Sequence, residues 1–168
     1  AREASTDGIA WTYSPMVDIC RDARWGRIAE GNGEDPWLSG LLGRAYVQGW
    51  QGDDLSDKQT LMACLKHYAL YGAAESGRDY NTTDMSENRM FNEYLLPYQM
   101  CVEAGVGSVM TSFNDINGIP ATANRWLQND VLRDKWNFDG FIVTDYGAIR
   151  EMKAHGLGGD DVVTERAL

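Results

Sequence analysis

Apolar and polar positions alternate in blocks along the chain, and four of the apolar blocks have the length and composition of strands. They lie at residues 9–18, 61–70, 106–113 and 139–145. The continuous apolar runs among them are typical of strands covered on both faces, as in a parallel sheet. The first block begins as a strand and breaks at Pro15, which has no amide hydrogen for a sheet ladder.

Helical segments are predicted between these blocks. Asp35 and Pro36 are typical of the cap and first position of a helix, which Gly49 and Gly52 would close. We expect the apolar positions of this helix to face the core. These positions are Leu38, Leu41, Leu42 and Ala45.

A second helix is predicted to begin at a Ser86 cap and to be kinked by Pro97. Its expected inward positions are Phe91, Tyr94, Leu95, Tyr98 and Val102. Residues 114–121 are predicted to form a loop, residues 124–136 a third helix, and residues 148–155 a further helical start. The third helix should direct Leu127, Val131 and Leu132 inward.

Strand-like and helix-like segments follow one another at spacings of roughly 35–45 residues, which indicates βα units and a parallel α/β sheet. A complete (β/α)8 TIM-type barrel needs about 250 residues. The 168 residues therefore predict a single partial domain, residues 1–168, from the central portion of such a barrel. The chain opens on Ala1 rather than Met, so we expect a fragment of a longer protein.

Composition narrows the classes of partner. The chain carries 15 basic and 25 acidic side chains, a formal net charge of −10 spread along its length. This argues against nucleic acid and anionic membranes, which require clustered Lys and Arg. No apolar stretch reaches about 18 residues, so no membrane insertion is expected. The three cysteines lack ligand spacing and the two histidines lie far apart, so no metal site is predicted.

Polar residues fall at the carboxyl ends of successive predicted strands. They are the loop at residues 21–27, the Lys66-His67 pair, Asn114 and Asp145. In a barrel these ends converge on one mouth, where active sites lie. Three of these residues also have a structural alternative. Asp145 could cap the next helix, His67 could be a hydrogen-bonded core histidine, and Arg27 could pair within its own loop.

Four motifs occur in order along nearly the whole chain. They are RDARWGRIAEGNGEDP at residues 21–36, KHY at 66–68, VMTSFN at 109–114 and VTDY at 143–146. Together they resemble glycoside hydrolase family 3, the β-glucosidase family, and its N-terminal catalytic barrel domain. The segments around residues 66–86 and 144–149 look most like the periplasmic bacterial β-glucosidases of that family.

The resemblance implies roles for individual residues. Asp145 would be the nucleophile that forms a covalent glycosyl-enzyme intermediate. Motif spacing assigns the family's sugar-binding arginine to Arg27 rather than Arg24. The implied substrate-binding residues are Arg27, Lys66, His67, Met110, Phe113 and Tyr146. Lys66 or Arg27 would supply positive charge near Asp145.

Some positions depart from the family pattern. Many relatives have Pro in place of Ala23, Tyr in place of Phe113 and Trp in place of Tyr146. The last two changes affect the aromatic wall of the sugar subsite, so they bear on substrate preference rather than on reaction class.

A retaining mechanism also needs a second carboxyl group as acid/base, about 5–5.5 Å from the first. Glu75, Asp79, Glu87 and Asp115 stand in no motif that marks one of them for this role. The loop at residues 69–84 has no His, which disfavours the N-acetylglucosaminidase branch of the family. We therefore expect the acid/base on a second domain, absent from these residues, and only trace turnover by the isolated chain.

The predicted function is that of a retaining exo-β-glycosidase acting on an oligosaccharide or aryl β-glycoside, with β-glucosidase activity as the first expectation. β-Xylosidase, glycoside phosphorylase and a non-catalytic sugar-binding piece remain alternatives. The resemblance implies a periplasmic or secreted protein that needs no cofactor. The sequence leaves the oligomeric state open.

Overall fold

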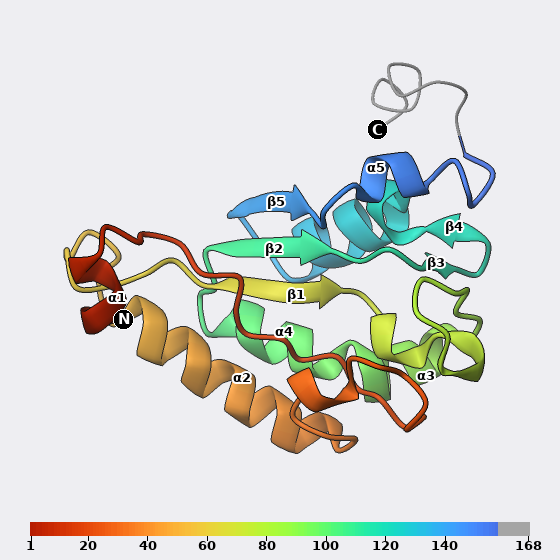
Figure 1. Ribbon diagram of the computed structural model, residues 1–168, viewed down its shortest axis with the longest axis horizontal. Coiled ribbons are helices and arrows are strands. Elements are labelled where there is room, and N and C mark those ends of the chain that lie inside the picture. Colours follow the sequence, from red (N-terminus) through yellow and green to blue (C-terminus); the bar gives the residue numbers. More distant parts are fainter. Residues whose placement is uncertain (158–168) are drawn as a thin grey trace.

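A computed structural model describes residues 1–157. Its centre is a three-stranded parallel sheet in the order β1-β2-β5 (Figure 1). The strands are β1 (Cys64–Tyr68), β2 (Ser108–Thr111) and β5 (Phe141–Thr144). Each lies within a predicted strand block, and Val109 pairs with Leu65 on one side and Ile142 on the other. The parallel α/β organisation follows because helical segments connect these strands.

The first predicted strand does not form. Residues 9–18 run beside β1 but make only two isolated parallel bridges, Trp11 with Met62 and Met16 with Lys66. Pro15 lies between these bridges and cannot donate to the ladder, which accounts for the interruption. The segment still delivers its last residues to the carboxyl end of the sheet.

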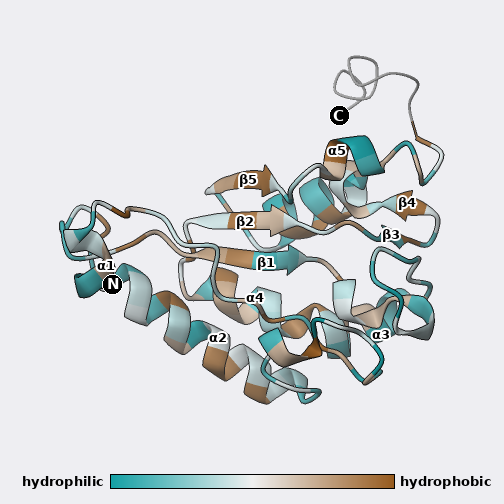
Figure 2. Cartoon of the chain, in the orientation of Figure 1, coloured by the Kyte–Doolittle hydropathy of each residue, from teal (hydrophilic) through white to brown (hydrophobic). Residues whose placement is uncertain are grey.

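Helix α2 (Pro36–Gln51) packs with α4 (Leu96–Glu103) on one side of the sheet (Figure 1). Its predicted ends are confirmed, since the Asp35 carboxylate accepts a 2.7 Å hydrogen bond from the Leu38 amide and Gly52 ends the helix at φ 59°. The predicted inward face is wrong. Leu38, Leu41 and Leu42 are 49%, 42% and 40% exposed, and Figure 2 shows apolar residues on the outer side of this helix.

The face that α2 buries is made largely of small residues: Ser39, Gly40, Gly43, Val47 and Gln51. A Cβ atom on Gly43 would lie 2.6 Å from Cys101 Sγ and 2.8 Å from a Val17 methyl carbon, and one on Gly40 would lie 2.3 Å from Met100 Sδ. Because Gly40 and Gly43 have no side chain, α2 and α4 can approach each other closely.

Gly43→Ala is expected to destabilise the protein by about 1–3 kcal/mol, because the new methyl group overpacks the α2–α4 contact. Gly49→Ala in the same helix meets no atom within 4 Å and should stabilise by up to about 1 kcal/mol through helix propensity. Urea unfolding of both variants measures the difference. Equal effects of the two substitutions would contradict this packing.

The second predicted helix is confirmed at its start, where the Ser86 hydroxyl accepts a 3.4 Å bond from the Arg89 amide. Instead of one kinked α-helix, α3 (Glu87–Arg89) continues as a π-helix (Met90–Tyr94) before α4 begins beside Pro97. Proline removes one backbone donor, which explains the altered ladder. Of its predicted inward positions, Tyr94, Leu95 and Tyr98 are buried, whereas Phe91 and Val102 are partly buried.

The remaining elements lie around the sheet. The third predicted helix is a π-helix (Trp126–Lys135) and buries Leu127, Val131 and Leu132 as expected. The predicted loop at 114–121 contains a hairpin, β3 (Asp115–Ile116) with β4 (Ile119–Pro120), whose turn uses Asn117 and Gly118 at φ 50° and 83°. Other helices are α1 (Arg2–Thr6), α5 (Ala148–Glu151) and 3-10 turns at Ile28–Glu30, Tyr71–Ala73, Glu75–Gly77 and Ala121–Ala123.

The main apolar core includes Leu65, Val109 and Tyr98, and it fills the space between the sheet and its helices. By contrast β5 is only partly covered by the described residues, and Phe141 is 44% exposed. The expectation that it is covered on both faces is therefore wrong for the part of the chain described. Over residues 1–157, no helix has the length and apolar character needed to cross a membrane.

Candidate active site

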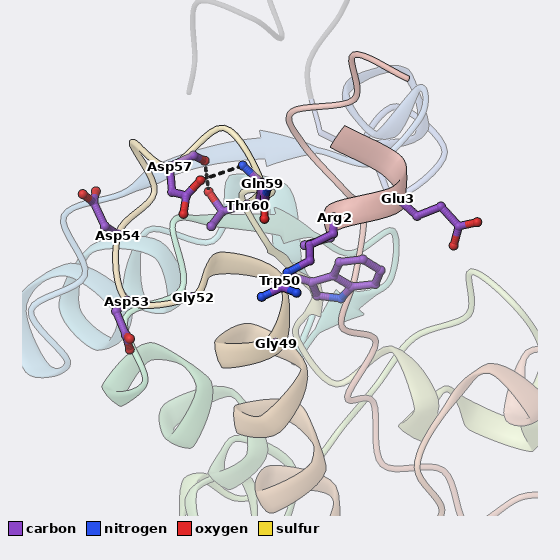
Figure 3. Close-up of a pocket in the computed structure, with 11 residues that line it drawn as sticks. Arg2, Glu3, Gly49, Trp50, Gly52, Asp53, Asp54, Asp57, Gln59 and Thr60 are labelled. Atoms are coloured by element: carbon purple, nitrogen blue, oxygen red, sulfur yellow. Dashed lines mark hydrogen bonds between the residues drawn. The ribbon is translucent and has the colours of Figure 1, made fainter. Parts of the chain in front are cut away.

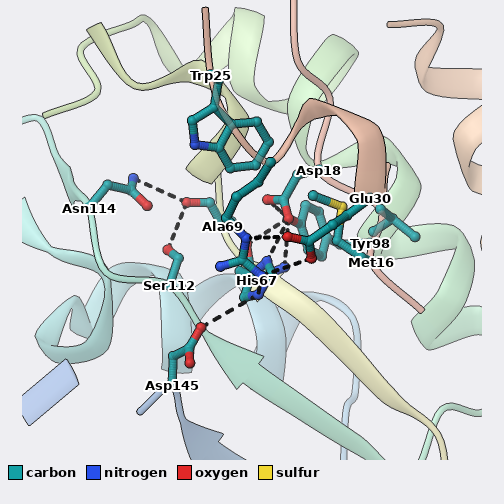
Figure 4. Close-up of polar contacts among 12 residues, drawn as sticks. Met16, Asp18, Trp25, Glu30, His67, Ala69, Tyr98, Ser112, Asn114 and Asp145 are labelled. Carbon is teal, nitrogen blue, oxygen red and sulfur yellow. Dashed lines mark hydrogen bonds and ion pairs between the residues drawn. The ribbon is translucent and has the colours of Figure 1, made fainter. Parts of the chain in front are cut away.

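The carboxyl ends of β1 and β5 place two predicted site residues next to each other (Figure 4). His67 belongs to β1, and Asp145 directly follows β5. His67 Nε2 lies 3.5 Å from Asp145 Oδ2. The histidine side chain is 1% exposed and the aspartate side chain 15%, so the carboxylate lies at the open side of the pair.

Arg27 reaches the same point from the loop after the first strand-like segment. Its Nη2 lies 2.9 Å from His67 Nε2, and its guanidinium stacks over Tyr71 at 5.4 Å from the ring centroid. The guanidinium also donates two hydrogen bonds, of 2.7 and 2.9 Å, to Glu30. Hydrogen bonds from Arg27, together with its positive charge and that of Lys66, hold the pKa of Glu30 below its usual value. Arg27 therefore pairs with Glu30 within its own loop and also contacts His67.

Arg24 lies differently. Its side chain is 70% exposed and pairs with Asp22 at the surface. Hydrogen bonds from Arg24 lower the pKa of Asp22 to about 2. Of the two arginines that the motif leaves open, Arg27 is the one that the fold brings to His67.

Asp18 is a site residue that sequence reasoning missed. Its side chain is fully buried, and its Oδ2 accepts 2.9 Å hydrogen bonds from both the backbone amide and the Nδ1 of His67. Its Oδ1 lies 2.6 Å from the hydroxyl of buried Tyr98 (Figure 4). Asp18 ends a strand-like run, as Asp145 does, so the rule that singled out Asp145 applies to it as well.

Lys66 is partly buried at the same end of β1. Within residues 1–157 it forms no ion pair with Asp145, although such pairing was one expectation for its charge. The residue that reaches Asp145 is His67.

Met110 and Phe113 come from β2 and its following loop, and they are 7% and 6% exposed. The Phe113 ring lies 4.4 Å from Tyr80 and 5.7 Å from Tyr71, and Tyr71 in turn meets His67 edge-on at 5.3 Å. Burial raises the pKa of the Tyr71 hydroxyl, so that phenol stays neutral. Aromatic rings thus form a wall beside Arg27 and His67.

Tyr146 and Asn114 lie apart from this wall. Tyr146 is 95% exposed, so its ring is in solvent, while its backbone amide donates a 2.6 Å hydrogen bond to Asp145 Oδ1. Asn114 is buried, and together with Ser112 it donates to the Ala69 carbonyl, which joins the loops after β1 and β2 (Figure 4).

A separate pocket lies near the amino end of the sheet, between α1 and the end of α2 (Figure 3). Arg2, Trp50, Asp57 and Thr60 line it, and it contains none of the predicted site residues. In the part of the chain that the structure describes, no three His, Cys, Asp or Glu side chains are placed to hold a metal ion.

Comparison with known proteins places this geometry in context. Residues 1–168 match the glycosyl hydrolase family 3 N-terminal domain. The chain is 49% identical over 160 residues to the periplasmic beta-glucosidase of Salmonella typhimurium, covering 95% of this chain and 21% of that protein. It is 44% identical over 149 residues to a beta-xylosidase of Formosa agariphila, covering 86% of this chain and 21% of that protein.

The fold agrees with the same relationship. A crystal structure of the Listeria innocua beta-glucosidase in complex with glucose superposes with a TM-score of 0.94 at 44% identity. The match covers 98% of this chain and 23% of that one, and the chain spans 21% of the length of the first relatives it matches. The predicted fold class, a parallel α/β portion of the barrel domain, is confirmed. So is the resemblance itself: the chain belongs to glycosyl hydrolase family 3, within that family's N-terminal domain.

Proposed function

We propose that the full-length protein carrying this chain is a retaining exo-β-glycosidase with Asp145 as its nucleophile. The observation that carries the proposal is the meeting of Asp145, His67 and Arg27 at the carboxyl end of a parallel sheet, in a family 3 member. The carboxyl end of the strands is where barrels of this kind place their chemistry.

The local structure supports a chemical role for Asp145 over a helix-capping role. The N-cap of the following helix α5 is Gly147, and no side chain caps that helix. Asp145 Oδ1 accepts the Tyr146 amide hydrogen instead, and Oδ2 faces His67. One carboxylate oxygen is thus held by the backbone, while the other, on the His67 side, would be the one that attacks the sugar.

In the proposed reaction, Asp145 attacks the anomeric carbon of the non-reducing terminal sugar. The bond from that carbon to the leaving oxygen breaks as a proton reaches the oxygen, and a glycosyl-Asp145 ester forms. Water then attacks the anomeric carbon and releases the sugar with retained configuration. We propose that the acid/base that moves both protons lies on a second domain, outside this chain.

The remaining predicted residues would hold the sugar. The hydrogen bonds of Arg27 to Glu30 and His67 use its Nε and Nη2, so Nη1 would be the donor offered to a sugar hydroxyl. Lys66 would donate to sugar hydroxyls from the same strand end, and Met110 and Phe113 would form an apolar floor. Donors held by strands orient the anomeric carbon against Asp145, which lowers the entropic part of the barrier. Tyr146 would close the subsite with its exposed ring.

β-Glucosides are the proposed substrates, because the relative with 49% identity is described as a periplasmic beta-glucosidase and a glucose complex superposes closely. β-Xylosidase activity is the second candidate, supported by the Formosa relative. The Salmonella relative also supports a periplasmic or secreted location. A phosphorylase would use the same Asp145 ester with phosphate as acceptor.

The substrate proposal predicts a kcat/KM for p-nitrophenyl β-glucoside at least about tenfold above that for the β-xyloside. An added hydroxymethyl group in a fitted subsite contributes on the order of 1–3 kcal/mol to discrimination. Initial rates with the full-length protein, with and without phosphate, measure this. A higher value for the xyloside would reassign the sugar, and sugar phosphate as the main product would reassign the acceptor.

A further inference from the structure

Asp18, His67 and Arg27 form a chain of contacts that determines where the histidine proton lies. Asp18 Oδ2 accepts from the backbone amide of His67 and lies 2.9 Å from its Nδ1. On the other side of the ring, Arg27 Nη2 lies 2.9 Å from His67 Nε2. The three residues come from two loops and one strand, and the Asp18 and His67 side chains are 0% and 1% exposed.

An arginine guanidinium has only donors, so a 2.9 Å contact with Arg27 requires Nε2 to offer a lone pair. The ring proton must then sit on Nδ1, where the Asp18 carboxylate accepts it. The opposite tautomer would place two N–H groups against each other at Arg27 and would leave a bare nitrogen facing Asp18. An imidazolium carries a proton on both nitrogens, so it would likewise place an N–H group against the Arg27 donor.

Tyr98 holds Asp18 in turn. Its hydroxyl lies 2.6 Å from both Asp18 Oδ1 and the His67 carbonyl oxygen, and its single proton is shared between these two acceptors. The tyrosine is fully buried, and its contact with Oδ1, together with the two His67 contacts at Oδ2, engages both oxygens of the Asp18 carboxylate.

We infer that Asp18 is a positioning residue that holds His67 as the Nδ1–H tautomer and, through the Nε2 lone pair, sets the direction of the Arg27 guanidinium. The inference rests on the proposed function for its catalytic consequence. With Nε2 unprotonated, His67 donates no hydrogen bond to Asp145 Oδ2 at 3.5 Å, so that oxygen stays available for attack. Arg27, with Glu30 on one side and His67 on the other, keeps a fixed orientation toward the sugar.

Nitrogen-15 NMR of the ligand-free full-length protein, labelled at histidine, tests the tautomer without any substrate. The His67 signals are assigned by their loss in His67→Gln. At neutral pH we expect a protonated Nδ1 and an unprotonated Nε2. An Nε2–H tautomer, or protons on both nitrogens, would overturn the inference. Because this readout needs no turnover, it stands or falls separately from the proposed glycosidase activity.

Kinetics of three variants test the positioning. Asp18→Ala removes the Nδ1 acceptor and should lower kcat/KM about 10²-fold, since small misplacements of binding groups cost that much. Asp18→Asn should lose less than about tenfold, because its amide oxygen can still accept Nδ1–H while its NH2 faces the Tyr98 hydroxyl. The matched control Ser39→Ala deletes another buried polar group, bonded to the neighbouring Val17 carbonyl, and should stay within about twofold.

A double-mutant cycle separates positioning from general support of the fold. In an Arg27→Ala background, Asp18→Ala should lower kcat/KM by clearly less than about 10²-fold, because its effect through Arg27 is gone and only its effect on His67 remains. Undiminished losses in both backgrounds, or wild-type kcat/KM in Asp18→Ala, would contradict the inference. If Asp18→Ala does not fold, Asp18→Asn and the NMR measurement on the unmodified protein still decide it.

Discussion

Asp145→Asn in the full-length protein is expected to lower kcat for an aryl β-glucoside by about 10⁴- to 10⁶-fold, the range found when a catalytic nucleophile is removed. The amide is close in size to the carboxylate, and its oxygen can still accept the Tyr146 amide hydrogen, so the fold around β5 should persist. What is lost is the oxygen that forms the glycosyl ester. Steady-state rates over a range of enzyme concentrations measure the change.

Asp139→Asn is the matched control. Asp139 is an exposed carboxylate just before the first residue of β5, at the end of the strand opposite to Asp145. It should stay within about twofold of the unmodified protein. Azide added to Asp145→Gly would further distinguish a nucleophile from a positioning carboxylate, since it can attack the anomeric carbon in place of Asp145 and give the α-glycosyl azide. An Asp145→Asn variant with more than about a tenth of the original kcat would exclude Asp145 as the nucleophile.

Arg27→Ala is expected to reduce kcat/KM by about 10²-fold. It removes the partner of His67 Nε2 and, on the proposed function, would remove charge-assisted hydrogen bonds to the sugar; bonds to charged groups are worth about 1.5–3 kcal/mol each. Part of the loss should appear in kcat, because the same group orients the ring against Asp145. Separate kcat and KM values for β-glucoside hydrolysis test both parts.

Arg24→Ala provides the control three residues away in the same motif. Its side chain is 70% exposed and its partner Asp22 is also at the surface, so kcat/KM should change by less than about twofold. If Arg24→Ala proved the damaging substitution and Arg27→Ala the mild one, the assignment of the sugar-binding arginine would be reversed.

Local signals were sufficient for the three strands of the sheet and for the helix caps at Asp35 and Ser86. They failed where size rather than hydrophobicity determines the contact. The leucines of α2 have the period of a buried face, but Gly40 and Gly43 allow the closer approach to α4 and so determine which side is buried. A hydrophobic pattern does not predict a helix contact that depends on glycines, which have no side chain.

Asp18 was missed because its hydrogen-bond partners lie far from it in the sequence. Asp18 and His67 are 49 residues apart, and Tyr98 lies a further 31 residues along the chain. No local pattern joins them, whereas the fold brings the segment before Asp18, strand β1 and helix α4 together and so places them in one hydrogen-bonded group. The choice between Arg24 and Arg27 likewise depended on motif spacing alone until the fold placed Arg27 beside His67.

The central claim is that Asp145 forms a covalent bond with the sugar. In the most direct test, the full-length protein is incubated with a 2-deoxy-2-fluoro β-glucoside and, separately, with the corresponding 2-deoxy-2-fluoro β-xyloside. Covalent labelling is then followed by intact mass and peptide mapping. The account predicts a fluoroglucosyl adduct on the peptide containing Asp145. Preferential labelling by the xyloside would keep the nucleophile and change the sugar. A label on another residue, or an active enzyme that neither compound labels, would contradict the claim.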